Sequence, residues 1–474
     1  MTLAPSKNEA ADLDRAMVSF DRIVELFGRE KVDKFSQIKR FMEIYSGDDK
    51  FREEVAAGNL DRLSKFGVFL GDLHPNELIG FSLYVERKNE KPIFKEFRRY
   101  MLLASQGRVG KGRQVSGDVD IEYSLWRLEQ INRGNFVFNK KTNNQIVHSP
   151  LCIELTKGCS VGCWFCGISA DTFEGSTIYT EKEEMYNAIL RDSSKLAGHF
   201  NLLAFLYWGT DPLDCPDYTS YLKAFAQQFG YYPQTTTAQA SKYPEQAKNI
   251  VRTTNSSGHG TVNRFSILSK GAMYKIMREF TPFELANTLM VMQQPSSITK
   301  KASAGRAAEE GDPDLIDREQ EYQQSTIACV SGFKINLATG MCALISPCES
   351  DDEFKDGFIT YATTKLSESN SIISFFKRYI ALRENLKLRL SPGISIEVNN
   401  ITHEIRAKSK MSSLITEKGS GQEVALRALK DKSMNHKELA CHLQRKGISI
   451  LYVDSAIQDL LNLGVICHEP GIVI

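Results

Sequence analysis

The stretch Gly158-Cys-Ser-Val-Gly-Cys-Trp-Phe-Cys-Gly167 decides the interpretation of this sequence. It holds three of the ten cysteines within eight residues, in the spacing CxxxCxxC, directly after the apolar segment 152–155. A [4Fe–4S] cube needs thiolates that a tight loop brings round it, and the glycines leave the backbone free to wrap. The spacing therefore predicts a cluster bound by Cys159, Cys163 and Cys166, with one iron left open.

The alternative explanation of these cysteines is a structural zinc site or a chance grouping. Zinc sites usually take four ligands as two separated pairs. No second cysteine pair or Cys/His couple lies near this stretch, and the other seven cysteines are dispersed. The spacing thus favours an iron–sulfur cluster over zinc.

Outward from the cysteine loop, short apolar runs alternate with amphipathic stretches. Strands are expected at 152–155, 202–208, 234–238, 264–268 and 285–292, and helices at 181–196, 218–229, 245–252 and 270–280. Alternating strands and helices imply a parallel sheet in an α/β fold. This many units predict a full or partial barrel, whose active site would lie at the carboxyl ends of the strands.

The rest of the chain divides into further regions. The expected boundaries are a helical N-terminal region at 1–147, the barrel at 148–325, a hairpin and helical extension that completes the active site at 326–390, and a small C-terminal domain at 391–474. The N-terminal helices are expected at 14–27, 35–45 and 122–131. The C-terminal domain is expected to have strands at 394–398 and 403–407, then helices at 423–430, 436–445 and 453–463.

Composition excludes some classes of function. The 474 residues are 42% apolar and 25% charged, as in an ordinary globular protein. A net charge of +1 gives no electrostatic case for nucleic acid or an anionic membrane as the main partner. The first twenty residues lack the apolar core of a signal peptide, and no run approaches the ~18 apolar residues of a membrane span. We therefore expect a cytoplasmic protein.

The cysteine motif resembles that of radical S-adenosylmethionine (SAM) enzymes, which place CxxxCxφC after the first strand of a partial (β/α)6 barrel. Phe165 holds the aromatic position φ, and Gly209-Thr-Asp-Pro212 follows the next expected strand, where the family has a turn that meets the SAM methionine. The resemblance implies a [4Fe–4S] cluster and SAM as cofactors. The residues that it places at SAM are Phe165, Gly209, Thr210, Asp211, Pro212, Thr235, Thr237, Arg264 and Ser266.

A second segment, Cys329-Val-Ser-Gly-Phe through Cys342-Ala-Leu-Ile-Ser-Pro-Cys348, narrows the resemblance. Together with the cluster motif it resembles the radical SAM peptide epimerases that mature proteusin-type ribosomal peptides. The resemblance implies L-to-D epimerisation, with Cys348 returning a hydrogen atom to the opposite face of Cα and Cys329 or Cys342 as the alternative donors. One cluster is expected, since Cys329, Cys342 and Cys348 lack the close spacing of an auxiliary site; a second cluster on these three cysteines, which lie within twenty residues, is the alternative.

The C-terminal domain resembles the small winged-helix domains that recognise the leader of a precursor peptide. The implied partners are a leader-bearing ribosomal precursor and a reducing electron donor such as flavodoxin or ferredoxin. Two other functions remain open from the sequence. One is a radical SAM peptide cyclase or methyltransferase, and the other is an iron–sulfur regulatory protein that binds DNA. Balanced charges at 430–438 argue against a phosphate-binding face.

Overall fold

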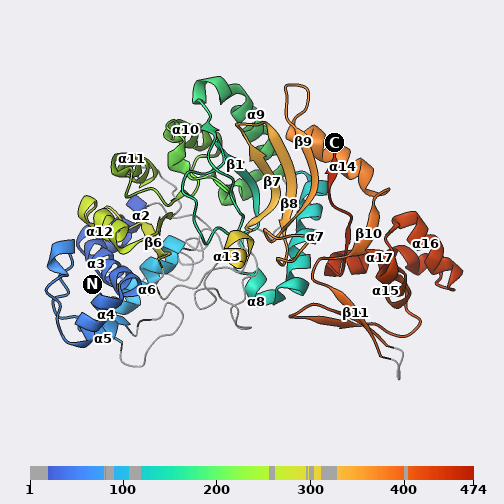
Figure 1. The fold of residues 1–474 in the computed structure, drawn as a ribbon, viewed down its shortest axis with the longest axis horizontal. Coiled ribbons are helices and arrows are strands. Elements are labelled where there is room, and N and C mark those ends of the chain that lie inside the picture. The colour runs from blue at the N-terminus through green and yellow to red at the C-terminus, as the bar shows by residue number, and fades with distance from the viewer. Residues whose placement is uncertain are drawn as a thin grey trace.

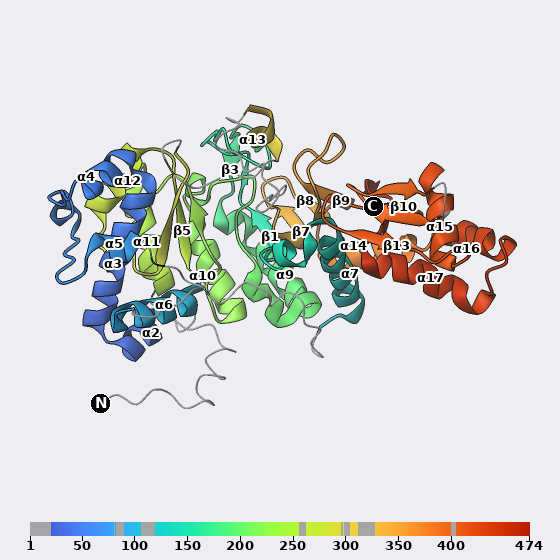
Figure 2. The same ribbon diagram turned by 90° about the horizontal axis from the view of Figure 1, so that it is seen from below.

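The computed structural model describes residues 20–79, 81, 90–105, 119–255, 262–294, 297, 304–310, 328–399 and 404–474. The expected helix at 14–27 and the end of the expected barrel region, at 296–325, therefore lie partly outside the described residues. Figures 1 and 2 show an elongated molecule with the N-terminal helices at one end, the main sheets in the middle and the C-terminal unit at the other end.

Two sheets form the middle of the molecule. The larger one has the order β1-β7-β8-β9-β16, with β1 (Ser149–Glu154), β7 (Val330–Asn336), β8 (Met341–Pro347), β9 (Phe358–Lys365) and β16 (Ile472–Val473). The second has the order β4-β5-β6, with β4 (Thr236–Thr237), β5 (Asn263–Ile267) and β6 (Thr288–Met292). In the larger sheet β1 pairs in parallel with β7, whereas β8 runs antiparallel to its neighbours β7 and β9. In the second sheet β5 pairs in parallel with both β4 and β6.

Phe205 links the two sheets. It bridges Cys152 of β1 on one side and Gln234, just before β4, on the other, both in parallel. The Ile153 amide donates to the Phe205 carbonyl at 3.1 Å. Because β6 and β16 remain at opposite ends of this linked order, the described strands form no closed barrel. The expected mixed α/β class is confirmed.

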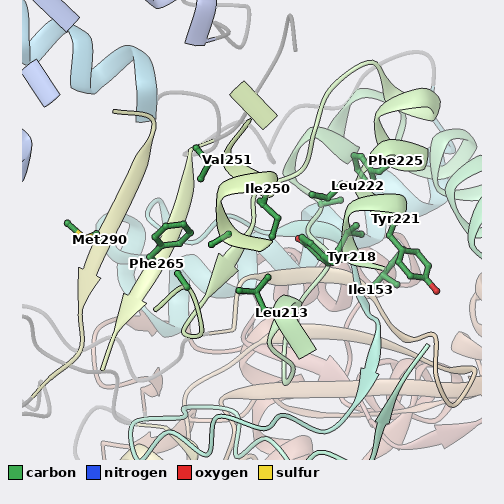
Figure 3. Close-up of a cluster of buried hydrophobic side chains, with 14 of the residues drawn as sticks. Ile153, Leu213, Tyr218, Tyr221, Leu222, Phe225, Ile250, Val251, Phe265 and Met290 are labelled. Carbon is green, nitrogen blue, oxygen red and sulfur yellow. The ribbon is translucent and has the colours of Figure 1, made fainter. Parts of the chain in front are cut away.

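Helices on the outer face bury the sheets. They are α9 (Tyr179–Ala197), α10 (Tyr218–Phe229), α11 (Pro244–Asn255), α12 (Lys270–Glu279) and α14 (Ile372–Arg383). Figure 3 shows Phe265 of β5 near Ile250 and Val251 of α11, and Met290 of β6 belongs to the same buried cluster. Each of these helices follows an amphipathic pattern, so burial of its apolar face against the sheet is what stabilises it.

The described N-terminal helices flank the β6 edge. They are α2 (Phe20–Phe27), α3 (Arg29–Gly47), α4 (Asp49–Ala56), α5 (Pro75–Ile79) and α6 (Pro92–Ser105), with a short 3-10 turn at Ser64–Phe66. On α3, the buried pair Lys39 and Glu43 (2.7 Å) reaches the sheet: Lys39 donates to the Leu285 carbonyl at 3.1 Å, and Glu43 accepts from the Met290 amide at 3.0 Å. Buried charges that are paired and hydrogen-bonded in this way are tolerated in a core.

Helix α7 (Ile121–Val137) packs on the larger sheet and is followed by α8 (Asn139–Asn143). Tyr123 stacks on Phe333 of β7 with ring centroids 5.2 Å apart. The buried Arg127 donates to the carbonyls of Ser331 at 2.9 Å and His148 at 2.6 Å. The end of the predicted helical N-terminal region therefore belongs to the packing of the central sheet.

The C-terminal unit has its own hydrophobic core. Its strands are β10 (Lys387–Leu390), β11 (Ser395–Val398), β12 (Ile405–Lys408), β13 (Ser413–Ile415), β14 (Met434–Asn435) and β15 (Ile466–His468), and its helices are α15 (Gly421–Asp431), α16 (His436–Arg445) and α17 (Ile450–Leu463). Leu388, upstream of the expected boundary at 391, belongs to this core, and β16 returns to pair with β9. Both expected strands and all three expected helices are confirmed.

The expected strand at 202–208 is wrong. Residues Gly198–Leu203 form a 3-10 helix, and only Phe205 makes sheet bridges. The cause is the buried Asn201, whose amide donates to the carbonyls of Ser193 and Gly198 at 2.9 Å each. These bonds satisfy carbonyls at the end of α9 and hold the chain in a helical turn.

No helix among the described residues combines the length and the apolar character needed to cross a membrane.

Candidate functional site

The three motif cysteines lie on a loop that leaves β1 and returns to the same place. We name residues 158–174 the cluster loop. Its two ends are joined by the antiparallel pairing of β2 (Thr156–Lys157) with β3 (Gly175–Ser176). The Cys159 amide donates to the Asp171 carbonyl at 2.9 Å, inside this closure. The loop is therefore a closed lobe whose base is fixed by backbone hydrogen bonds.

Glycines allow the tight path at the start of the loop. Gly158 has φ +74°, and a Cβ there would lie 2.1 Å from the Thr172 carbonyl oxygen. Gly162 has φ +61° but open space around it. Farther along, the Ala170 amide donates to Cys166 Sγ at 3.3 Å. Hydrogen bonds to ligating sulfurs tune the potential of iron–sulfur clusters.

The loop lines a cavity of about 500 Å³, which we name the cluster cavity and which is within the size range of cofactor sites. All three cysteines contribute to its wall. The expected site residues that line it are Cys159, Cys163, Phe165, Cys166, Gly209, Thr210, Asp211, Arg264 and Ser266. The structure therefore brings together, in one cavity, residues that are spread over about a hundred positions of the sequence.

Burial sets the protonation of the thiols. Burial is the main reason that the pKa of Cys159 rises to about 11 and the pKa of Cys163 rises to about 12, and the neighbouring Cys166 makes a smaller contribution to both values. In the ligand-free protein these groups are thiols at neutral pH, so metal binding would release their protons.

Among the described residues, no group of three or more His, Cys, Asp or Glu side chains converges as the ligands of one metal ion would. A [4Fe–4S] cluster does not require that convergence, because each thiolate binds a different iron. The three cysteines line one cavity, as the ligands of such a cluster would.

Two carboxylates fix the turn that faces the loop. Glu154, at the end of β1, accepts from the Gly209 amide at 2.8 Å. Asp211 accepts from Thr237 Oγ1 at 2.6 Å and from the Ala238 amide at 2.7 Å. Burial raises the pKa of Asp211 to about 6, against the effect of these hydrogen bonds. The turn is thereby held at the carboxyl ends of β1 and β4.

Three expected SAM contacts do not line the cavity. Thr235 bonds the Tyr218 hydroxyl at 2.8 Å behind the strand, and Thr237 bonds Asp211. Thr236, between them, lines the cavity, as strand alternation requires. Pro212 begins the 3-10 turn Pro212–Asp214 and lies outside the lining. Of the polar residues at the end of this strand, Thr236 is therefore the one that faces the cavity.

Two further polar side chains lie in the cavity wall. Trp208 Nε1 and Gln293 Oε1 are buried and have no hydrogen-bond partner among the described residues. One is a donor and the other an acceptor. Buried polar atoms are nearly always satisfied, so this pair indicates that the cavity is built for a polar ligand. No spacing or motif marks either residue in the sequence.

The alternative donor cysteines separate in space. Cys329 lines the cluster cavity and packs with Cys152 and Ile345 on the inner face of the sheet. Cys342 and Cys348 are buried in the main core, where burial raises the pKa of both thiols. Cys348 lies near Arg133 and Cys467, outside the lining of the cluster cavity. Cys342 lines a second, neighbouring cavity of about 410 Å³.

Comparison with known proteins gives one relative to report. No protein-family profile matches the chain, and no solved structure matches it. A protein of Sinorhizobium fredii, the uncharacterized protein y4wI, is 30% identical over 389 residues, which cover 73% of this chain and 74% of the relative. The aligned length exceeds any one region of the chain, so the likeness is not confined to a single motif. The chain belongs to the same family as the uncharacterized protein y4wI.

Proposed function

We propose that this chain is a radical SAM peptide epimerase with one [4Fe–4S] cluster. The observation that carries the proposal is the single cavity lined by Cys159, Cys163 and Cys166 together with the Gly209 turn. The cavity lies where β1, β4 and β5 end, which is the position of active sites in parallel α/β folds. In this proposal the open parallel strands form a partial (β/α)6 barrel.

The cavity wall supplies binding groups of the required kinds. The three thiolates would hold the cluster, and Phe165 lies beside them in the wall. Trp208 Nε1 and Gln293 Oε1 would pair with polar groups of SAM or substrate, which removes the cost of leaving them unsatisfied. When bound, SAM supplies a 5′-deoxyadenosyl radical that takes a hydrogen atom from a substrate Cα.

We assign the return of hydrogen to Cys329. Its side chain lines the cluster cavity, whereas Cys348 and Cys342 do not. The Cys329 S–H bond breaks and a Cα–H bond forms on the opposite face, which converts an L residue to a D residue. One electron and one proton from a reductant, of the flavodoxin or ferredoxin kind, restore the thiol.

The test is the reaction of single-cysteine variants in heavy water with a leader-bearing precursor peptide. Cys329→Ala is expected to make 5′-deoxyadenosine and to lose deuterium incorporation at Cα. Cys348→Ala is the matched control and is expected to retain incorporation, with a loss of stability of about 1–3 kcal/mol for a small buried group. Loss of incorporation only in Cys348→Ala would overturn the assignment to Cys329.

The same assay separates the competing functions. Epimerisation adds about one dalton per site in heavy water, methylation about fourteen, and crosslinking removes two (isotope arithmetic on the transferred groups). A product mass of either of the latter kinds would replace the epimerase by a methyltransferase or cyclase. Absence of any product, with tight DNA binding instead, would favour a regulatory protein.

We further propose that the C-terminal unit binds the leader of the precursor peptide. Among the described residues β13 pairs with β12 alone, so its other edge can accept an extended peptide strand. A cavity of about 500 Å³ borders this edge and is lined by Ile415, Leu463 and Asp459 among others. The apolar side chains, 51% and 45% exposed, can bury a leader side chain there.

The leader site is tested with two arginine substitutions of exposed isoleucines. Ile415→Arg, at the β13 edge, is expected to weaken binding of the precursor by about tenfold, as loss of one buried apolar anchor does. Ile450→Arg, at the opposite end of α17 from Leu463 and 70% exposed, is expected to leave binding unchanged. Equal effects of the two variants would remove the β13 edge from the proposal.

A further inference from the structure

A short helix packs directly on the cluster loop from a distant part of the chain. Helix α13 (Gly305–Glu310) buries Ala307, and Ala304 just before it is buried as well. Gly305 has φ +51°, and a Cβ there would lie 2.6 Å from the Gly167 carbonyl carbon and 2.9 Å from the Cys166 oxygen. Only glycine allows this approach, because backbone atoms cannot yield as a flexible side chain can.

Arg306 joins the two limbs of the cluster loop. Its Nη1 donates to the Cys163 carbonyl at 3.0 Å, and its Nη2 donates to the Ala170 carbonyl at 2.9 Å. These carbonyls lie on either side of Cys166 along the chain. One planar guanidinium therefore fixes the separation of the segments that flank this cysteine.

The helix is itself anchored on the loop between β8 and β9. The Gly305 amide donates to the Lys355 carbonyl at 2.8 Å. An exposed ion pair between Lys355 and Glu309, at 3.4 Å, joins the same two segments and contributes little. The backbone bond therefore sets the position of α13, and the ion pair offers a control position on the same helix.

We propose that Arg306 is a positioning residue that holds the cluster loop in the conformation that receives an iron–sulfur cluster. The clamp consists of Arg306 on the two carbonyls and of Gly305 against Gly167. The inference rests on the proposed function only for the identity of what the loop binds.

The experiment measures amide hydrogen exchange in the metal-free full-length protein. Arg306→Gln is expected to speed exchange of residues 158–170 by about tenfold or more, because two hydrogen bonds from a charged group are lost. Arg306→Lys keeps the charge and one donor and should rescue part of the protection. Glu309→Gln, which removes only the exposed ion pair, should exchange as the wild type does.

A second variant reaches the clamp without touching Arg306. Gly305→Ala is expected to push α13 off the Gly167 backbone and to speed exchange in the same residues. It keeps the test open if Arg306→Gln does not fold. Unchanged exchange of residues 158–170 in Gly305→Ala and Arg306→Gln would overturn the inference, and so would a rise spread evenly over the whole molecule.

The reconstituted protein provides the readout at the metal. The midpoint potential of the cluster is expected to move to more negative values in Arg306→Gln than in Arg306→Lys, because only the first removes a positive charge near it. Identical potentials in the two variants would contradict the placement of the guanidinium. A wild-type protein that binds no iron would end the proposed function, while the exchange data would still decide whether Arg306 positions the loop.

Discussion

Substituting Gly158 by alanine should open the base of the cluster loop, and the structure gives the size of the effect. The new Cβ would lie 2.1 Å from the Thr172 carbonyl oxygen. Ordinary carbon–oxygen contacts are longer than this, so the backbone at Thr172 must move away from residue 158 by roughly 1 Å. That movement breaks the bonds from the Cys159 amide to Asp171 (2.9 Å) and from the Glu174 amide to Lys157 (2.8 Å).

The free-energy cost has two parts. A left-handed conformation costs alanine about 1–2 kcal/mol relative to glycine. The two backbone hydrogen bonds contribute about 0.5–1.5 kcal/mol each. The closed form of the loop should therefore lose about 2–5 kcal/mol relative to the open form.

Gly162→Ala is the matched control in the same loop. Its φ of +61° imposes the same conformational cost, but nothing lies within 4 Å of the added Cβ. Amide exchange at Cys159 and Glu174 in the metal-free protein is the assay. Gly158→Ala should exchange faster than Gly162→Ala by about 5- to 150-fold, the part due to the broken hydrogen bonds. Equal exchange in the two variants would refute the assignment of the clash as the cause.

Three further predictions concern stability. Burial lowers the pKa of His468 to about 2, so this side chain stays neutral in the folded protein, while in the unfolded chain it titrates near 6.5. The free energy of unfolding should therefore be full above pH 6.5 and fall by about 1.4 kcal/mol per pH unit below it. Denaturant titrations at pH 7 and pH 5 should show a smaller fall in His468→Gln than in the wild type. Glu154→Ala should cost about 1–3 kcal/mol by denaturant titration, because the Gly209 amide loses its acceptor, and Glu154→Gln should restore most of it. Arg127→Met should lower the free energy of unfolding at the thermal midpoint by about 3 kcal/mol or more, since the buried carbonyls of Ser331 and His148 lose their charged donor. A loss below about 1 kcal/mol would contradict the packing of α7 described above.

Local patterns in the sequence predicted the elements that depend on local signals. The apolar periodicity of 218–229 predicted the bounds of α10, and the hairpin expected within 326–390 is formed by β7 and β8. Both elements are determined by periodicity or by turn residues. The strand expected at 202–208 failed because Asn201 bonds carbonyls of the preceding helix, and an apolar run does not reveal such bonds.

The sequence predicted those residues of the candidate site that belong to a motif. The cysteines and the Gly209 turn carry fixed spacings, and they share one cavity in the structure. The sequence did not reveal that Thr236 lines the cavity while Thr235 and Thr237 do not, because two-residue alternation cannot be fixed without the register. Arg306 could not be found, since its partners lie about 140 positions away and guanidinium-to-carbonyl bonds leave no pattern in sequence.

The placement of the three candidate donor cysteines shows the same limit. The resemblance favoured Cys348, which follows a strand and a Ser-Pro turn. In the structure, alternation along β8 turns Ile345 to the inner face and leaves Cys342 in the outer core. Cys329 precedes β7 and lines the cavity. Which face a residue takes depends on register, and register comes from long-range pairing.

Iron binding by the three motif cysteines decides whether this chain holds the proposed [4Fe–4S] cluster. The triple variant Cys159→Ala, Cys163→Ala, Cys166→Ala and the control Cys441→Ala, which changes an exposed cysteine of α16, are reconstituted with iron and sulfide under anaerobic conditions. The account predicts charge-transfer absorption and 5′-deoxyadenosine formation in the control and neither in the triple variant. A triple variant that keeps both the absorption and the SAM cleavage would contradict it.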